Sequence, residues 1–110
     1  MYSVTGGLPR VYGVASPPAP AQPRVFLTGT VRWTHGLGLR VRTGPGPAYP
    51  QVGTLYDGAD VQVVCQVSGP VMQSDVASTN LWDLMPDGRW VSDAWVDDHL
   101  GTNAQVAPNC

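Results

Sequence analysis

Apolar and polar residues alternate in short runs along most of the chain. The clearest run is 61–67, in which every second residue is apolar and two of the residues between them are glutamine. A period of two places neighbouring side chains on opposite faces of a β-strand. In 37–42 the same alternation predicts that Leu37, Leu39 and Val41 face inward. The predicted strands are 24–33, 37–42, 52–56, 61–67, 81–85 and 89–91.

Turn-forming residues separate these runs. Two prolines and two glycines in 43–47 cannot join a strand ladder, so this segment is predicted to be a turn or loop. Gly58 ends the strand before it, and 86–88 has the composition of a hairpin turn. The polar stretch 68–80 is expected to be a long loop, and 92–94 one short helical turn. Five or six short strands without a helical period predict an all-β fold, a small barrel.

The composition strengthens this prediction. The chain has 110 residues and no Lys, Glu or Ile, so most of the strong helix formers are missing. Sixteen Val and nine aromatic residues favour strands, and 13 Gly and 11 Pro interrupt the chain every few residues. These features disfavour a helical bundle, a coiled coil and a doubly wound α/β sheet. At this length one domain is expected.

The charge distribution disfavours some partners. A net charge of −2 argues against nucleic-acid binding, which needs a clustered basic face. Residues 1–42 hold five Arg and no acid, whereas the rest hold eight Asp and one Arg. The basic segment would suit docking on an acidic surface, and ordinary solvated charge is the alternative. No run of 18 apolar residues is present, so no membrane insertion is expected.

Few residues suit catalysis or metal binding. His35 and His99 are the only histidines, and there is no Glu to act as an acid with a raised pKa. The cluster 97–99 offers two carboxylates and an imidazole without a repeated ligand spacing, so a solvated turn is expected there. No phosphate-binding loop occurs. The sequence therefore predicts a protein that is not an enzyme and uses no metal or cofactor.

The first 28 residues are predicted to form an extended Pro-rich arm, followed by the barrel at 29–110 with its C-terminal tail. A polyproline II-like segment packs no core of its own and often serves as a flexible linker. Here we expect the arm to be held against its own domain or an adjacent subunit, which predicts a homo-oligomer or larger assembly. The proline spacing is also that of a ligand for an aromatic groove. The predicted docking residues are Arg10, Tyr12, Pro17, Pro20 and Pro23.

The segment 39–55, with the sequence LRVRTGPGPAYPQVGTL, resembles the opening of bacterial SH3-like domains, the SH3b or SH3_3 family. The segments 58–64 and 87–96 are similar to later strands of the actinobacterial forms, with Trp95 in place of a tyrosine. The resemblance covers about residues 29–110. It implies an SH3-like β-barrel of five to six short strands.

The turn within this motif has a physical interpretation of its own. Gly44 and Gly46 are expected to adopt backbone angles that other residues resist, while the two prolines stiffen the loop. Arg42 is expected to brace the turn by donating to its exposed carbonyls, with an anion contact as the alternative.

Aromatic residues are the best candidates for a binding site. So small a barrel cannot fully bury five large rings, so some should line a surface groove with Asp83 or Asp93 as polar partners. The resemblance implies a peptide-binding groove and an association with cell-wall peptidoglycan. Half-buried core is the alternative for each ring. The predicted ligand-binding residues are Tyr49, Tyr56, Trp82, Asp83, Trp90 and Trp95.

The chain has two cysteines. Cys65 lies on an alternating strand face, which suits packing or a disulfide, and Cys110 is the last residue. In the actinobacterial forms the tail is similar, val-ala-pro-x-cys, which implies a Cys65–Cys110 bridge. Two free thiols are the alternative. A bridge would place the protein in an oxidising location outside the cytoplasm.

Two functions are expected from these features. The first is a module at the cell surface that binds peptidoglycan or a partner chain through the aromatic groove. The second is a purely structural subunit of an actinobacteriophage virion, a capsid decoration or tail protein, that docks through its arm. Residues 1–14 lack the basic start and long apolar stretch of a signal peptide, which favours the virion. The implied disulfide and the family association favour the first.

Overall fold

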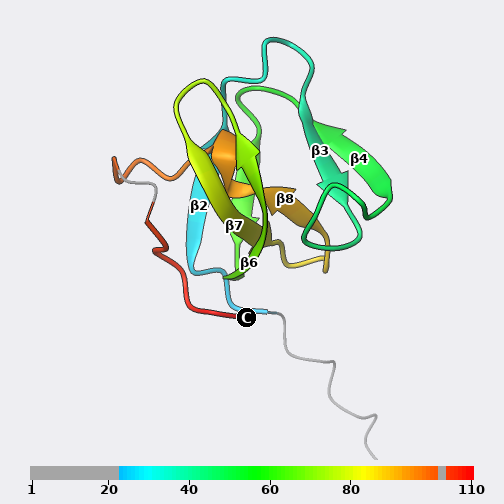
Figure 1. Cartoon of the computed structure of the whole chain (residues 1–110). Coiled ribbons are helices and arrows are strands. Elements are labelled where there is room, and N and C mark those ends of the chain that lie inside the picture. The colour runs from blue at the N-terminus through cyan, green and yellow to red at the C-terminus, as the bar shows by residue number, and fades with distance from the viewer. Residues whose placement is uncertain (1–22, 102–103) are drawn as a thin grey trace, which may run out of the picture.

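The strands form two antiparallel sheets in the computed structural model, which describes residues 23–101 and 104–110 (Figure 1). The three-stranded sheet has the order β5-β2-β9 and the five-stranded sheet the order β4-β3-β8-β7-β6. The all-β prediction is confirmed, whereas the docking residues Arg10, Tyr12, Pro17 and Pro20 lie outside the described residues. The elements are β2 (Leu27–Val31), β3 (Leu39–Arg42), β4 (Gln51–Leu55), β5 (Asp60–Val63), β6 (Cys65–Gln73), β7 (Ser78–Leu84), β8 (Trp90–Ser92), η1 (Asp93–Trp95) and β9 (Val96–Asp97).

The core lies between the two sheets and consists mainly of valine. Both sheets contribute, because the period-two alternation turns every second residue of each strand inward. Burying each of these side chains stabilises the fold by about 1.5–3 kcal/mol. The fold begins before residue 29, since β2 already includes Leu27 and Thr28. The buried cluster comprises Val31, Leu39, Val41, Val61, Val63, Met85, Val91, Val96 and Ala107.

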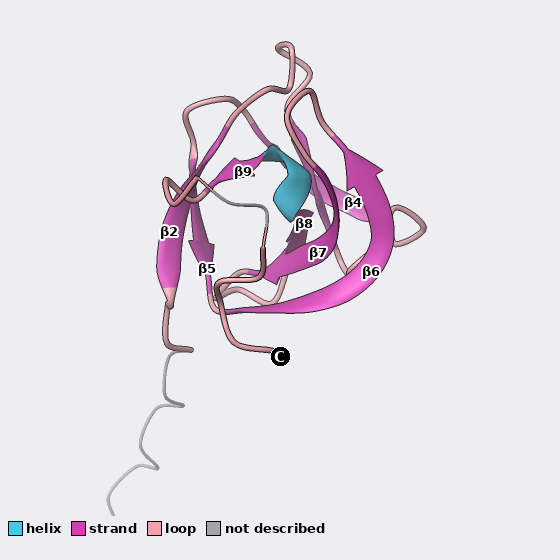
Figure 2. Cartoon of the chain, turned by 60° about the vertical axis from the view of Figure 1, so that its left-hand side comes forward, coloured by secondary structure: helices cyan, strands magenta, loops and turns pink. Residues whose placement is uncertain are grey.

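The predicted strand 61–67 is two strands that belong to different sheets. β5 pairs with β2, and after Val64 the chain continues as β6, which pairs with β7. β6 is long and strongly curved (Figure 2). The alternation stops at this corner, because Cys65 and Gln66 are both buried. A period of two does not reveal where a strand leaves one sheet for the next.

The prediction of a long loop at 68–80 is wrong. β6 extends to Gln73 and β7 begins at Ser78, so most of this segment is a hairpin. The last pairs are Met72 with Thr79 and Gln73 with Ser78, after a shift in register. Backbone hydrogen bonds hold these strands together while many of their side chains point to solvent. The segment therefore has no apolar period that would indicate a strand.

Leu37 was expected to face inward, but its side chain is 79% exposed. The backbone N–H of Leu37 donates to the carbonyl of Thr34, so this segment is a turn. Gly38 follows with φ of +83°, which breaks the extended backbone and delays β3 to Leu39. Leu39 and Val41 are buried, as predicted.

The loop between β3 and β4 depends on its glycines for space. Neither Gly44 nor Gly46 has a positive φ, so the expectation of unusual backbone angles is wrong. A Cβ on Gly44 would overlap the ring of Tyr49, which packs directly on the glycine. Arg42 Nη1 donates to the Tyr49 carbonyl at 2.9 Å, so Arg42 braces this loop as predicted.

The C-terminal tail is tied to the start of β6. Cys65 and Cys110 form a disulfide, with 5.0 Å between their Cα atoms, so the predicted bridge is confirmed. The Gln66 side chain accepts hydrogen bonds from the N–H groups of Val106 and Ala107, at 3.3 and 3.1 Å. One covalent bond and several hydrogen bonds thus fix the tail along the sheet.

Candidate binding groove

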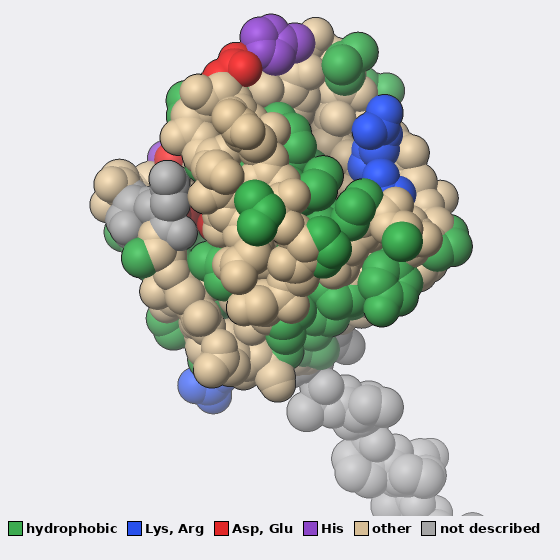
Figure 3. Space-filling model, viewed as in Figure 1, with side chains coloured by type: hydrophobic (Ala, Val, Ile, Leu, Met, Phe, Trp, Pro, Cys, Tyr) green, Lys and Arg blue, Asp and Glu red, His purple; other side chains and the backbone are tan. Residues whose placement is uncertain are grey.

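A cavity of about 480 Å³ opens on the surface over β3, β7 and β8. The loop 33–38 forms one of its walls, and the tip of the β6–β7 hairpin forms another. Apolar side chains gather on this face of the molecule, and basic side chains lie beside them over β3 (Figure 3). The cavity is hereafter called the groove. It is lined by Trp33, Thr34, His35, Leu37, Gly38, Leu39, Arg40, Arg42, Met72, Gln73, Ser74, Asp75, Trp82, Ser92 and Trp95.

Three tryptophans from three elements line the groove. Trp82 of β7 is 1% exposed, and its indole Nε1 donates to the carbonyl of Pro70 at 3.0 Å. This hydrogen bond holds the ring in place as part of the floor. Trp95 of η1 and Trp33 of the loop are only half-buried, so they retain surface for a ligand. An indole offers a large apolar face together with one polar N–H.

The loop that carries Trp33 is held in an unusual conformation. Trp33 and His35 have φ of +66° and +55°, in the left-handed region that non-glycine residues seldom occupy. Thr34 lies between them, buried, and its N–H and hydroxyl both donate to Asp57 Oδ1, at 3.3 and 2.5 Å. The Thr34 oxygen also accepts a hydrogen bond from the N–H of Gly38. These bonds stabilise the strained backbone and fix how Trp33 and His35 are presented.

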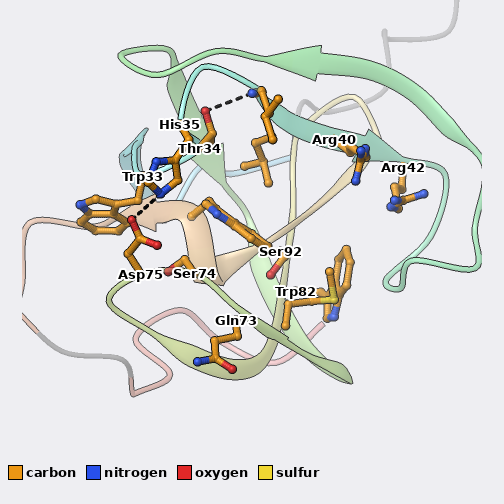
Figure 4. Close-up of a pocket in the computed structure, with 15 residues that line it drawn as sticks. Trp33, Thr34, His35, Arg40, Arg42, Gln73, Ser74, Asp75, Trp82 and Ser92 are labelled. Atoms are coloured by element: carbon orange, nitrogen blue, oxygen red, sulfur yellow. Dashed lines mark hydrogen bonds and ion pairs between the residues drawn. The ribbon is translucent and has the colours of Figure 1, made fainter.

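Charged side chains lie at opposite sides of the groove. His35 Nε2 and Asp75 Oδ2 are 2.6 Å apart and join the loop to the hairpin (Figure 4). Arg40 and Arg42 lie on the other side, both on β3. One side of the groove thus holds a carboxylate that is already bonded to an imidazole, and the other side holds two guanidinium groups.

The structure brings together only part of the predicted ligand-binding set. Trp82 and Trp95 line the groove. Tyr49 packs on Gly44, Tyr56 lies against Gly38, and Trp90 is half-buried on β8; none of these three lines the groove. Local sequence places aromatic residues near loops, but it does not say which of those loops meet.

Asp83 is fully buried and is not a partner for a ligand in the groove. Its Oδ1 accepts a hydrogen bond of 2.7 Å from Gln66 Nε2. Burial raises the pKa of the Asp83 carboxyl well above its ordinary value, and the neighbouring Asp93 raises it further. Burial also raises the pKa of Asp93, which lies on η1 beside the groove residues Ser92 and Trp95. The two acids therefore belong to the interior that supports η1.

Sequence reasoning missed several groove residues. Trp33 was assigned to the strand 24–33, although β2 ends at Val31. Arg40 lies in the predicted strand 37–42 without a predicted role, and Met72 and Asp75 lie in the predicted loop 68–80. Gly36 and Gly38 were the one sequence signal for this part of the groove. Two glycines so close together disfavour a regular strand and favour a loop directly after Trp33.

The cluster at 97–99 is occupied by contacts within the protein. Asp97 Oδ2 lies 3.0 Å from Arg32 Nε and 3.6 Å from His99 Nδ1. Within 23–101 and 104–110, no three His, Cys, Asp or Glu side chains are arranged to hold a metal ion. No helix in the same residues is long and apolar enough to cross a membrane.

Two bacterial proteins are similar to this chain. It is 28% identical over 89 residues to the uncharacterized protein YraJ of Bacillus subtilis (strain 168), an alignment that covers 74% of each chain. It is 25% identical over 89 residues to the uncharacterized protein YraI of the same organism, covering 74% of this chain and 73% of YraI. No family model matches the sequence.

Proposed function

We propose that this chain is a non-catalytic SH3-like module that acts outside the cytoplasm and binds the peptide part of cell-wall peptidoglycan in the groove. The observation that carries this proposal is the meeting of Trp33, Trp82 and Trp95 around one open cavity of about 480 Å³. Rigid indoles bury a large ligand area at little entropic cost. A cavity of this size is within the range of small-ligand sites and suits a few residues of extended peptide.

Other features support the same proposal. Two antiparallel sheets around a valine core agree with the SH3-like barrel that the motif at 39–55 implies. The Cys65–Cys110 disulfide fits an oxidising location outside the cytoplasm. YraJ and YraI, which are similar over about three-quarters of this chain, are also bacterial proteins. A virion subunit without a ligand is the alternative, and it predicts that the groove binds nothing.

Retention on insoluble peptidoglycan tests this function. The parent chain should co-sediment with purified walls, and Trp33→Ala and Trp95→Ala should each weaken binding by about tenfold or more. Phe26→Ala is the matched control, since Phe26 is an exposed aromatic residue outside the groove. Thermal melting of each variant checks that the fold persists. A parent chain that is not retained, or folded groove variants that bind as the Phe26 control does, would overturn the proposal.

A further inference from the structure

The basic side of the groove is built by one short strand. Arg40 and Arg42 are two residues apart on β3, so both point away from the buried Leu39 and Val41. Figure 4 shows both arginines on the side of the groove away from His35 and Asp75. Two cations on one strand face repel each other unless an anion lies between or beside them.

Within the described residues, most arginines already have a partner. Arg32 pairs with Asp97 and Arg89 pairs with Asp87, at 3.0 and 2.7 Å. Arg42 gives one of its donors to the Tyr49 carbonyl, which leaves its other donors available. The Arg40 side chain forms no hydrogen bond and no ion pair with any residue in 23–101 or 104–110, whereas its backbone lies in the β3–β4 ladder.

The groove supplies no counterion of its own for Arg40. Asp75 is the one acid among the groove-lining residues, and its carboxylate is already held by His35 at 2.6 Å. Arg40 lines the same groove as three indole rings, and because it is exposed its guanidinium is accessible to an anionic ligand. A ligand that carries a carboxylate would supply the counterion that the groove lacks.

We propose that Arg40, assisted by the free donors of Arg42, binds a carboxylate of the ligand and so fixes the direction in which an extended peptide lies in the groove. A guanidinium and a carboxylate match in a planar, two-bond geometry. The peptide chain then runs from Arg40 past the half-buried Trp95 and Trp33 rings towards the His35–Asp75 pair. This inference rests on the proposed function, and it identifies the ligand class as the carboxylate-bearing stem peptide.

The test compares native walls with walls whose carboxylates have been converted to amides. The parent chain should bind amidated walls roughly 10- to 100-fold more weakly, because a hydrogen bond to a charged group contributes about that much to binding affinity. Arg40→Gln should show the same loss on native walls and no further loss on amidated walls. Arg24→Gln is the matched control, because Arg24 is exposed and outside the groove, and it should bind both preparations as the parent does.

The possible outcomes separate this inference from the function on which it rests. If the parent is not retained on native walls, the proposed function itself is wrong. If the parent is retained while folded Arg40→Gln binds as Arg24→Gln does, the carboxylate assignment is wrong and wall binding stands. Equal retention of the parent on native and amidated walls would overturn the assignment independently of any variant.

Discussion

Asp83 and Asp93 bring two carboxyl groups together inside the protein, where Asp83 Oδ2 has no hydrogen-bond donor among the described residues. Two ionised carboxylates cannot bond each other, so a proton must lie between them for the pair to be satisfied. The other groups that act on Asp83 are the amide of Gln66, which bonds Oδ1, and the carboxylate of Asp98, whose charge also favours the protonated form. If Asp83 is protonated and donates to Asp93, Oδ2 gains a hydrogen-bond partner and the two carboxyl groups no longer repel each other.

This pair predicts that stability decreases as the pH rises. Because the pKa of Asp83 is raised in the folded chain, folding keeps a proton that the unfolded chain releases above its ordinary pKa of about 4. The free energy of unfolding is therefore highest below that pH and falls as the pH rises through the raised pKa of the folded state. Asp83→Asn should flatten this dependence and stabilise the chain at neutral pH. Urea unfolding from pH 4 to 9 measures both effects.

Asp60→Asn is the control for this prediction, because Asp60 is an exposed acid on β5. It should keep the pH dependence of the parent. Parallel stability curves for the parent and Asp83→Asn would show that the buried pair does not hold the extra proton.

Gln66 is predicted to be the most sensitive of the glutamines in the described part of the chain. Its side chain is 2% exposed, accepts from two tail N–H groups and donates to Asp83. Gln66→Leu leaves these buried groups without partners and should lower the free energy of unfolding by about 2–4 kcal/mol. Gln62→Leu alters an exposed residue of β5 and should stay within about 0.5 kcal/mol of the parent. Similar denaturation midpoints for the two variants would contradict this account.

Loss of the disulfide should be the largest single effect. The cysteines are 45 residues apart, and opening a loop of that length costs about 4 kcal/mol on the chain-entropy model. Cys110→Ser should therefore shift the urea midpoint well below that of the oxidised parent. Reductant should bring the parent to the same midpoint and leave the variant unchanged. Two freely alkylated thiols in the native parent would refute the bridge.

Gly69 should tolerate no side chain. A Cβ at this position would lie 2.5 Å from the Pro45 carbonyl oxygen and 2.7 Å from the Trp82 ring. Gly69→Ala should destabilise the fold by about 1–3 kcal/mol and shift the Trp82 fluorescence. At Gly46 the nearest atom would be 3.4 Å away, so Gly46→Ala serves as the tolerated counterpart. A Gly69→Ala chain as stable as Gly46→Ala would be inconsistent with this packing.

The fold could be predicted where burial follows local alternation. Leu39, Val41, Val61 and Val63 each face the core as their period of two indicates. The pattern fails where backbone pairing alone defines the strand, as in the solvent-exposed end of the β6–β7 hairpin. It also fails at Leu37, where the φ of the neighbouring Gly38 overrides an apolar side chain.

The groove could be predicted only in part for a related reason. Trp95 agrees with the expectation that large aromatic residues in a small barrel retain some surface, whereas Trp82 is buried beneath the groove. Trp33 and Arg40 are neighbours in the sequence, but Asp75 comes from a hairpin far along the chain from both. Their meeting depends on tertiary contacts such as the Thr34–Asp57 and His35–Asp75 hydrogen bonds, which no local pattern encodes.

The tail bound at Gln66 also has a consequence for solubility. β6 is the outermost strand of its sheet, and an outer strand exposes N–H and C=O groups that can pair with another molecule and start aggregation. Here Asn109 pairs alongside Gln66, and the Cys110 N–H donates to the Gln66 carbonyl. The tail thus occupies the beginning of this edge, and the disulfide keeps it from leaving. The covalent bond therefore keeps this part of the edge from pairing with another molecule.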